Sequence, residues 1–244
     1  IINKKLFFFI SFFPVVYILL FYLLFHQEVR YTLLLVPFLA ILAAHALNYF
    51  LDFLSKSPLK FLVVLLVIIY PLSLAVKFDQ LLDQKDTRLM AKDWINENLA
   101  PSSKIIVNLE GVKITPAKVA IERQHNLDPA TLRTIDRTLL FLPVERYPRP
   151  SYDTLDLPFV ENALPQDLIS YARENQFRYF AVSYWQQEDL SASELALAGA
   201  GKMVVSFSQN KSGVNYNFLG NYQGPAWNLL QIERLGPTVE IYEL

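Results

Sequence analysis

The chain has 244 residues, with 53% hydrophobic residues and a formal net charge of −1, and its lack of cysteine excludes disulfides and thiolate chemistry. Residues 1–77 hold six Lys or Arg against two acidic residues, whereas residues 78–244 hold 16 against 21, so the two parts differ in character. The acidic second part argues against a nucleic-acid partner, because nucleic acids select a basic surface.

Three apolar runs predict membrane-spanning helices at about 6–25, 31–51 and 59–76. A spanning helix needs about 20 apolar residues, and a tilted or thin crossing accommodates the shorter third run. The first run is too long for a signal peptide, and another run follows it closely. We therefore predict a membrane region at 1–77 and an α/β domain at 78–244. Because the chain starts at Ile1 rather than Met, we expect it to be a fragment of a longer protein.

The lysines of the membrane region predict its orientation. Lys4 and Lys5 precede the first run, and Lys56 and Lys60 lie between the second and the third. The positive-inside rule places both groups in the cytoplasm, and Lys77 is a minor counter-signal. We therefore expect a multi-pass protein of the cell membrane whose C-terminal domain is extracytoplasmic.

The second part opens with a predicted helix at 86–99, which Asp86 caps and Pro101 ends. Residues 104–109 predict a strand. Asp128-Pro129 predicts a helix start, and apolar residues follow at helical spacing up to Leu142. Residues 143–165 carry five prolines and predict an irregular, extended stretch.

The remaining residues alternate between helix and strand signals. We predict a helix at 165–175, a strand at 178–183, a short helix capped by Ser191 and Glu194, and a strand at 202–207. Residues 227–233 and 238–243 predict a closing hairpin around Leu235-Gly236-Pro237. Helices and strands in alternation indicate a layered α/β domain.

Most catalytic patterns are missing from the sequence. It contains no GxGxxG, GxxxxGK or GxSxG. His26, His45 and His125 lack the spacing of metal ligands, so no metal site is predicted. Asn210-Lys211-Ser212 is a formal glycosylation sequon, but such triplets often occur by chance.

One polar group stands out between the first two apolar runs. His26, Glu28, Arg30 and Tyr31 would lie at the outer membrane surface. A guanidinium binds phosphate through two parallel hydrogen bonds, a nearby carboxylate can hold it in place, and the imidazole offers another donor. The group suits a substrate with a lipid tail and an anionic head. The alternative is an arginine that only snorkels to lipid phosphates.

These residues also carry a resemblance. HQEVRY, followed by LLLVPFLAILAA, resembles the HKExRF-type segment of GT-C membrane glycosyltransferases, whose donors are sugars on polyprenyl or dolichyl phosphate. Four positions match, and Gln27 stands in place of the Lys. DTRLMAKDWINENLAP at 86–101 resembles the segment that opens the outer domain in bacterial relatives of protein mannosyltransferases and aminoarabinose transferases.

The resemblance implies three C-terminal spans of a GT-C bundle plus an extracytoplasmic α/β domain. It implies transfer of a hexose or pentose from a polyprenyl-phosphate donor to a glycan, lipid or protein acceptor, with lipid phosphate bound by His26, Glu28, Arg30 and Tyr31. It assigns no cofactor besides the lipid-linked donor, and its catalytic acidic residue lies outside this chain, so the chain alone is expected to be inactive. The alternatives are a non-enzymatic, membrane-anchored binding module and part of a polyprenyl-lipid transporter.

Overall fold

The computed structural model describes residues 4–24, 35–53, 59–109, 111–160, 163–165, 167–210, 213–214, 216–217 and 225–244. The chain divides into two compact units between Val76 and Lys77. The second, called here the α/β unit, comprises Lys77–Asn217 and Gly224–Leu244.

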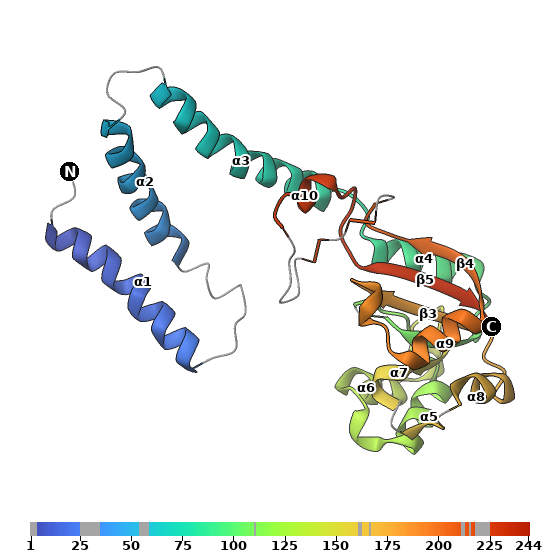
Figure 1. Cartoon of the computed structure of the whole chain (residues 1–244). Coiled ribbons are helices and arrows are strands. Elements are labelled where there is room, and N and C mark those ends of the chain that lie inside the picture. Colours follow the sequence, from blue (N-terminus) through green and yellow to red (C-terminus); the bar gives the residue numbers. More distant parts are fainter. Residues whose placement is uncertain are drawn as a thin grey trace. The chain divides into compact units, whose positions relative to one another are not determined.

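Three helices make up the first part of the chain in Figure 1: α1 (Lys4–Leu24), α2 (Val36–Phe53) and α3 (Leu59–Leu82). They overlap the three apolar runs, although α3 extends beyond the predicted end at 76 and residues 31–34 lie outside the described residues, so the prediction of helices there is confirmed. The rings of Phe13 and Phe38 join α1 to α2, with centroids 4.6 Å apart. Within the described residues, one helix, which includes α3, is long and apolar enough to cross a membrane, and none of its apolar stretch is buried. Membrane crossing itself stays a prediction.

The α/β unit contains one five-stranded sheet in the order β2-β1-β3-β5-β4. β1 pairs in parallel with β2 and β3, and β5 pairs antiparallel with β3 and β4. The strands are β1 (Lys104–Asn108), β2 (Asp153–Asp156), β3 (Tyr179–Tyr184), β4 (Lys202–Phe207) and β5 (Thr238–Glu243). β1 to β4 therefore end at a common edge, called here the carboxyl edge, where β5 begins. The predicted α/β class is confirmed.

Alternation along the strands gives the sheet two apolar faces. Ile105 and Val107 pack with Ile95 and Leu99 of one helix, whereas Ile106 lies on the other face with Leu197. Helix α4 covers the first face, and α7, α8 and α9 cover the second (Figure 1). The helices of this unit are α4 (Thr87–Asn98), α5 (Lys118–Leu127), α6 (Thr134–Leu140), α7 (Leu157–Val160), α8 (Leu168–Glu174), α9 (Ala192–Ala200) and α10 (Asn228–Gln231).

Several local predictions are confirmed because their signals are short-range. Asp86 accepts a hydrogen bond from the backbone N–H of Arg88 and caps α4. Ser191 and Glu194 form a reciprocal capping box at the start of α9, and Gly201 follows its end. β4 has the predicted bounds, and β5 matches 238–243. Helix α8 starts later than predicted, because Asp167 provides its cap.

Three local predictions are wrong. The predicted strand at 227–233 contains the short helix α10 (Asn228–Gln231) instead, and β5 pairs with β3 and β4 rather than closing a hairpin with it. Asp128 ends α5 instead of starting a helix; a 3-10 turn at Pro129–Thr131 follows, and α6 starts only at Thr134. The stretch 143–165 was predicted to be irregular, but it contains β2 and α7. The prediction failed because β2 is a short edge strand of four residues that begins just after several prolines, and these prolines hide its pattern.

Candidate functional site

The four residues predicted to bind a lipid phosphate are His26, Glu28, Arg30 and Tyr31. All four lie at 25–34, outside the described residues. The described chain on either side consists of α1, which ends at Leu24, and α2, which starts at Val36. The lipid-phosphate site therefore stays a prediction from the sequence.

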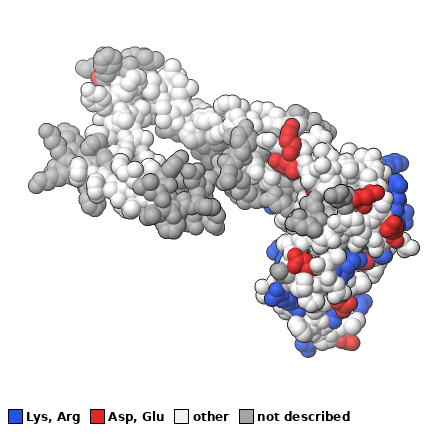
Figure 2. All heavy atoms as spheres, turned by 60° about the horizontal axis from the view of Figure 1, so that its bottom comes forward, with Lys and Arg blue, Asp and Glu red and all other residues white. Residues whose placement is uncertain are grey.

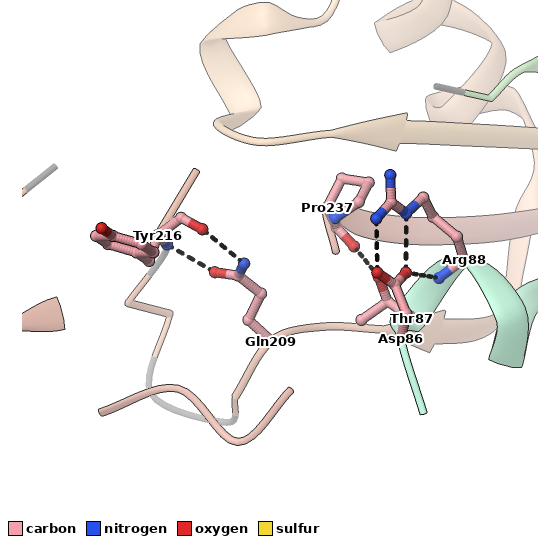
Figure 3. Close-up of polar contacts among 6 residues, drawn as sticks. All are labelled: Asp86, Thr87, Arg88, Gln209, Tyr216 and Pro237. Carbon is pink, nitrogen blue, oxygen red and sulfur yellow. Dashed lines mark hydrogen bonds and ion pairs between the residues drawn. The ribbon is translucent and has the colours of Figure 1, made fainter. Parts of the chain in front are cut away.

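The Asp86-Thr87-Arg88 segment forms a tight polar junction where α4 begins (Figure 3). Asp86 Oδ1 accepts hydrogen bonds from the backbone N–H and Nε of Arg88, both at 2.8 Å, and Asp86 Oδ2 accepts one from Arg88 Nη2 at 2.6 Å. Both side chains are about one-fifth exposed, at 19% and 21%. This geometry uses both carboxylate oxygens to fix the start of the helix, which is the capping role that the sequence predicts.

Thr87 connects this junction to the approach of β5. Its side chain is fully buried; its Oγ1 donates to the carbonyl of Pro237 at 2.7 Å, and its N–H donates to the carbonyl of Leu235 at 3.0 Å. Gly236 lies between them with a φ of +107°, and a Cβ there would clash with Thr87 Oγ1 and Asp86 Oδ1. Because Thr238 pairs with Tyr184, the last residue of β3, the junction lies at the carboxyl edge.

Two buried amides organise the connection from β4 to β5. The Gln209 side chain donates to the carbonyl of Tyr216 at 2.9 Å and accepts from its N–H at 2.7 Å (Figure 3). Asn210 Nδ2 donates to the carbonyls of Val214 at 2.9 Å and Gln231 at 3.4 Å. Only 7% of Asn210 is exposed, so the sequon amide is engaged inside the fold.

A carboxylate–arginine cluster lies at the end of β2. Arg133 Nε donates to Asp136 Oδ2 at 2.7 Å, and Asp136 is 1% exposed. Burial raises the pKa of Asp156 to about 6; the nearby Arg133 opposes this shift and Asp136 adds to it. Arg123 pairs with buried Asp153 on the same strand and donates to the carbonyl of Thr154 at 3.0 Å. Each buried carboxylate with an arginine partner thus has its charge compensated.

A second polar link joins β1 to α9 at the carboxyl edge. Asn108 Nδ2 donates to Glu194 Oε1, and Glu194 is 4% exposed. The other oxygen of Glu194 accepts from the N–H of Ser191 at 2.7 Å. Both oxygens therefore bind within the fold, so this carboxylate positions a helix and is not offered to a ligand.

Comparison with known proteins gives no match to a protein-family model, a curated protein or a solved structure. Among the described residues, no group of three or more His, Asp or Glu side chains is arranged to hold a metal ion. The polar clusters of the α/β unit described above join elements of the fold to each other.

Sequence reasoning identifies only part of this polar framework. The caps at Asp86 and Ser191 have local signatures, and Arg133 with Asp136 shows the three-residue spacing of a helical ion pair. The Gln209–Tyr216 and Asn108–Glu194 hydrogen bonds join residues that are 7 and 86 positions apart, and no local sequence pattern predicts them.

Proposed function

We propose that this chain is part of an integral membrane glycosyltransferase that moves a sugar from a polyprenyl-phosphate donor to an acceptor outside the cytoplasm. The observation that carries the proposal is the His26–Tyr31 segment, HQEVRY, between two apolar helices. It combines a cation, a carboxylate and an imidazole at the position expected for a membrane surface. Such a group can bind an anionic head whose lipid tail stays in the bilayer.

Two features of the described residues support this proposal. Helices α1 and α2, of 21 and 18 residues, flank the segment, so it connects two long apolar helices. The Asp86-Thr87-Arg88 junction, which bonds the start of α4 to the approach of β5, begins only four residues after α3 ends at Leu82. Only residues 83–85 therefore lie between the end of α3 and the cap of α4.

The proposed chemistry assigns this chain the stabilisation of the leaving group. An acceptor hydroxyl forms a bond to the sugar carbon while the carbon–oxygen bond to the lipid phosphate breaks. The acceptor proton passes to a carboxylate outside this chain, and the electron pair stays on the phosphate. Arg30, with His26 as a further donor, stabilises the negative charge that develops there, and Glu28 orients Arg30.

The test is Arg30→Ala in the full-length protein, assayed in membranes with a radiolabelled polyprenyl-phosphate sugar. Losing one preorganised donor to a developing charge lowers kcat by roughly 100-fold or more. We expect that loss with unchanged membrane insertion, and a smaller loss for Arg30→Lys, which keeps the charge without the two-pronged geometry.

Gln27→Ala is the matched control, since it changes the same segment without removing a charge. We expect it to retain most of the activity. If Arg30→Ala keeps activity within a few-fold of the unchanged protein, Arg30 does not stabilise the leaving phosphate. Free substitution of the whole His26–Tyr31 segment would favour a membrane-anchored binding module instead.

A further inference from the structure

The segment Arg133–Arg149, called here the arginine segment, exposes large apolar side chains. Ile135 is 62% exposed, Phe141 is 87% exposed and Val144 is 62% exposed. Scattered single apolar residues are ordinary on protein surfaces. Three such side chains lie within ten residues of the chain, and exposed apolar groups concentrated in this way can mark an interaction site.

The same segment is basic within an acidic part of the chain. It contains Arg133, Arg137, Arg146 and Arg149 against Asp136 and Glu145, a net of +2, whereas residues 78–244 carry a net of −5. Asp136 is buried against Arg133, so its charge is compensated inside the fold. Figure 2 shows Lys and Arg interspersed with Asp and Glu among white surface on the face that comes forward, where α5 and α6 lie in Figure 1.

The fold holds this surface in place. Lys118 Nζ donates to the carbonyl of Leu142 at 2.6 Å and that of Leu140 at 3.2 Å, which fixes the end of α6 to the start of α5. Tyr147 Oη donates to the carbonyl of Pro116 at 2.6 Å. The exposed side chains therefore project from a bonded framework.

The arginine segment also begins near the carboxyl edge of the sheet, where α4 starts. The Arg133 guanidinium lies 5.5 Å from the ring centre of Phe159 in α7, and α7 follows β2 directly, so α6 starts by the carboxyl edge. The α4 junction, a few residues after α3, lies at the same edge.

We infer that the arginine segment docks on an anionic lipid surface. Ile135, Phe141 and Val144 enter the boundary between headgroups and acyl chains, and the arginines bind lipid phosphates. Apolar side chains beside Arg or Lys bind membranes in this way, with a strength that rises with apolar area and anionic lipid. The charge of the segment complements such a surface. The inference rests on the membrane anchorage within the proposed function.

The test uses the full chain in nanodiscs that contain lipids with a spin-label quencher. Because the chain has no cysteine, Thr138→Cys gives a single fluorophore site between Ile135 and Phe141 and keeps every apolar side chain of the surface. Two matched variants serve as references: Val67→Cys within α3 and Leu195→Cys on the exposed side of α9. We expect the Thr138 probe to be quenched several-fold more than the Leu195 probe, and more strongly when anionic lipid is included.

Loss of the extra quenching after Arg137→Glu with Arg146→Glu would support the role of charge. A Thr138 probe quenched no more than Leu195, beside a strongly quenched Val67 probe, would overturn lipid docking and leave the anchorage standing. An unquenched Val67 probe would overturn both the anchorage and the docking. Quenching that does not respond to anionic lipid would refute the electrostatic part.

Discussion

At the residue scale, Gly236 has the tightest surroundings among the described glycines. Its φ of +107° lies in a region that other residues rarely adopt, and its missing side chain leaves room for Thr87 and Asp86. The close approach allows Thr87 to bond both Leu235 and Pro237. A side chain at this position would therefore strain the backbone and separate α4 from β5.

We expect Gly236→Ala to destabilise the α/β unit by about 2 kcal/mol or more, because backbone strain and a displaced buried hydrogen bond add together. Thermal unfolding followed by near-ultraviolet circular dichroism measures the loss. Gly199→Ala is the control: a Cβ there meets nothing within 4 Å, and alanine favours the helix. Equal unfolding temperatures for the two variants would show that the junction tolerates a Cβ.

Asp156 predicts a pH dependence of stability. Burial raises its pKa from 3.8 to about 6, so the folded chain keeps a proton that the unfolded chain loses between these values. The free energy of unfolding therefore falls as the pH rises from about 4 to about 6, by up to about 3 kcal/mol, and this contribution stays constant above that range.

Asp156→Asn should remove this dependence, since the amide does not ionise. We expect the variant to unfold at a higher temperature than the unchanged protein near pH 8 and at a similar temperature well below pH 3.8, where Asp156 is protonated in both the folded and the unfolded state. Glu145→Gln, at an exposed position, should leave the pH profile unchanged. A wild-type profile in Asp156→Asn would show that another group carries the effect.

At the element scale, a helix or strand can be predicted from the sequence when the residues that determine it lie close together in the chain. The start of α9 needs only Ser191 and Glu194, three residues apart, and the sequence predicts it. The strand β2 forms by pairing with β1, as at Lys104↔Asp153, two residues 49 positions apart in the sequence. The prolines before and after β2 hide its strand pattern in the sequence. The apolar residues of α10 fit a strand as well as a short helix, and buried Leu229 and Ile232 decide between them only in the folded unit. The His26–Tyr31 site rests on residue types alone.

The capping box of α9 gives an element-scale prediction. Ser191→Ala should cost about 1 kcal/mol, because the N–H of Glu194 loses its acceptor. The change should also loosen the Asn108–Glu194 link, so amide hydrogen exchange should accelerate in the first turn of α9. Ser206→Ala on the exposed side of β4 should leave both measurements unchanged. Unaltered exchange in Ser191→Ala would mean that Asn108 alone holds Glu194.

At the scale of the whole molecule, the carboxyl edge of the sheet brings together distant parts of the chain. The start of α4, the approach to β5 and the Asn108–Glu194 link all lie there. Because α3 ends four residues before Asp86, this edge is also the closest in sequence to the apolar helices. A membrane crossing by α3 would therefore leave the cap of α4, at the carboxyl edge, only a few residues along the chain from the membrane-spanning helix.

That arrangement requires α3 to separate two compartments, and single cysteines in the cysteine-free chain test it. Ser55→Cys lies between α2 and α3, and Gln187→Cys lies on the exposed surface of the α/β unit. We expect a membrane-impermeant maleimide to label Gln187→Cys in intact cells and Ser55→Cys only after permeabilisation, because the lysines around Ser55 favour the cytoplasm. Labelling of both sites from one side would show that α3 does not cross. The reversed pattern would place the α/β unit in the cytoplasm, away from a donor whose sugar is presented outside.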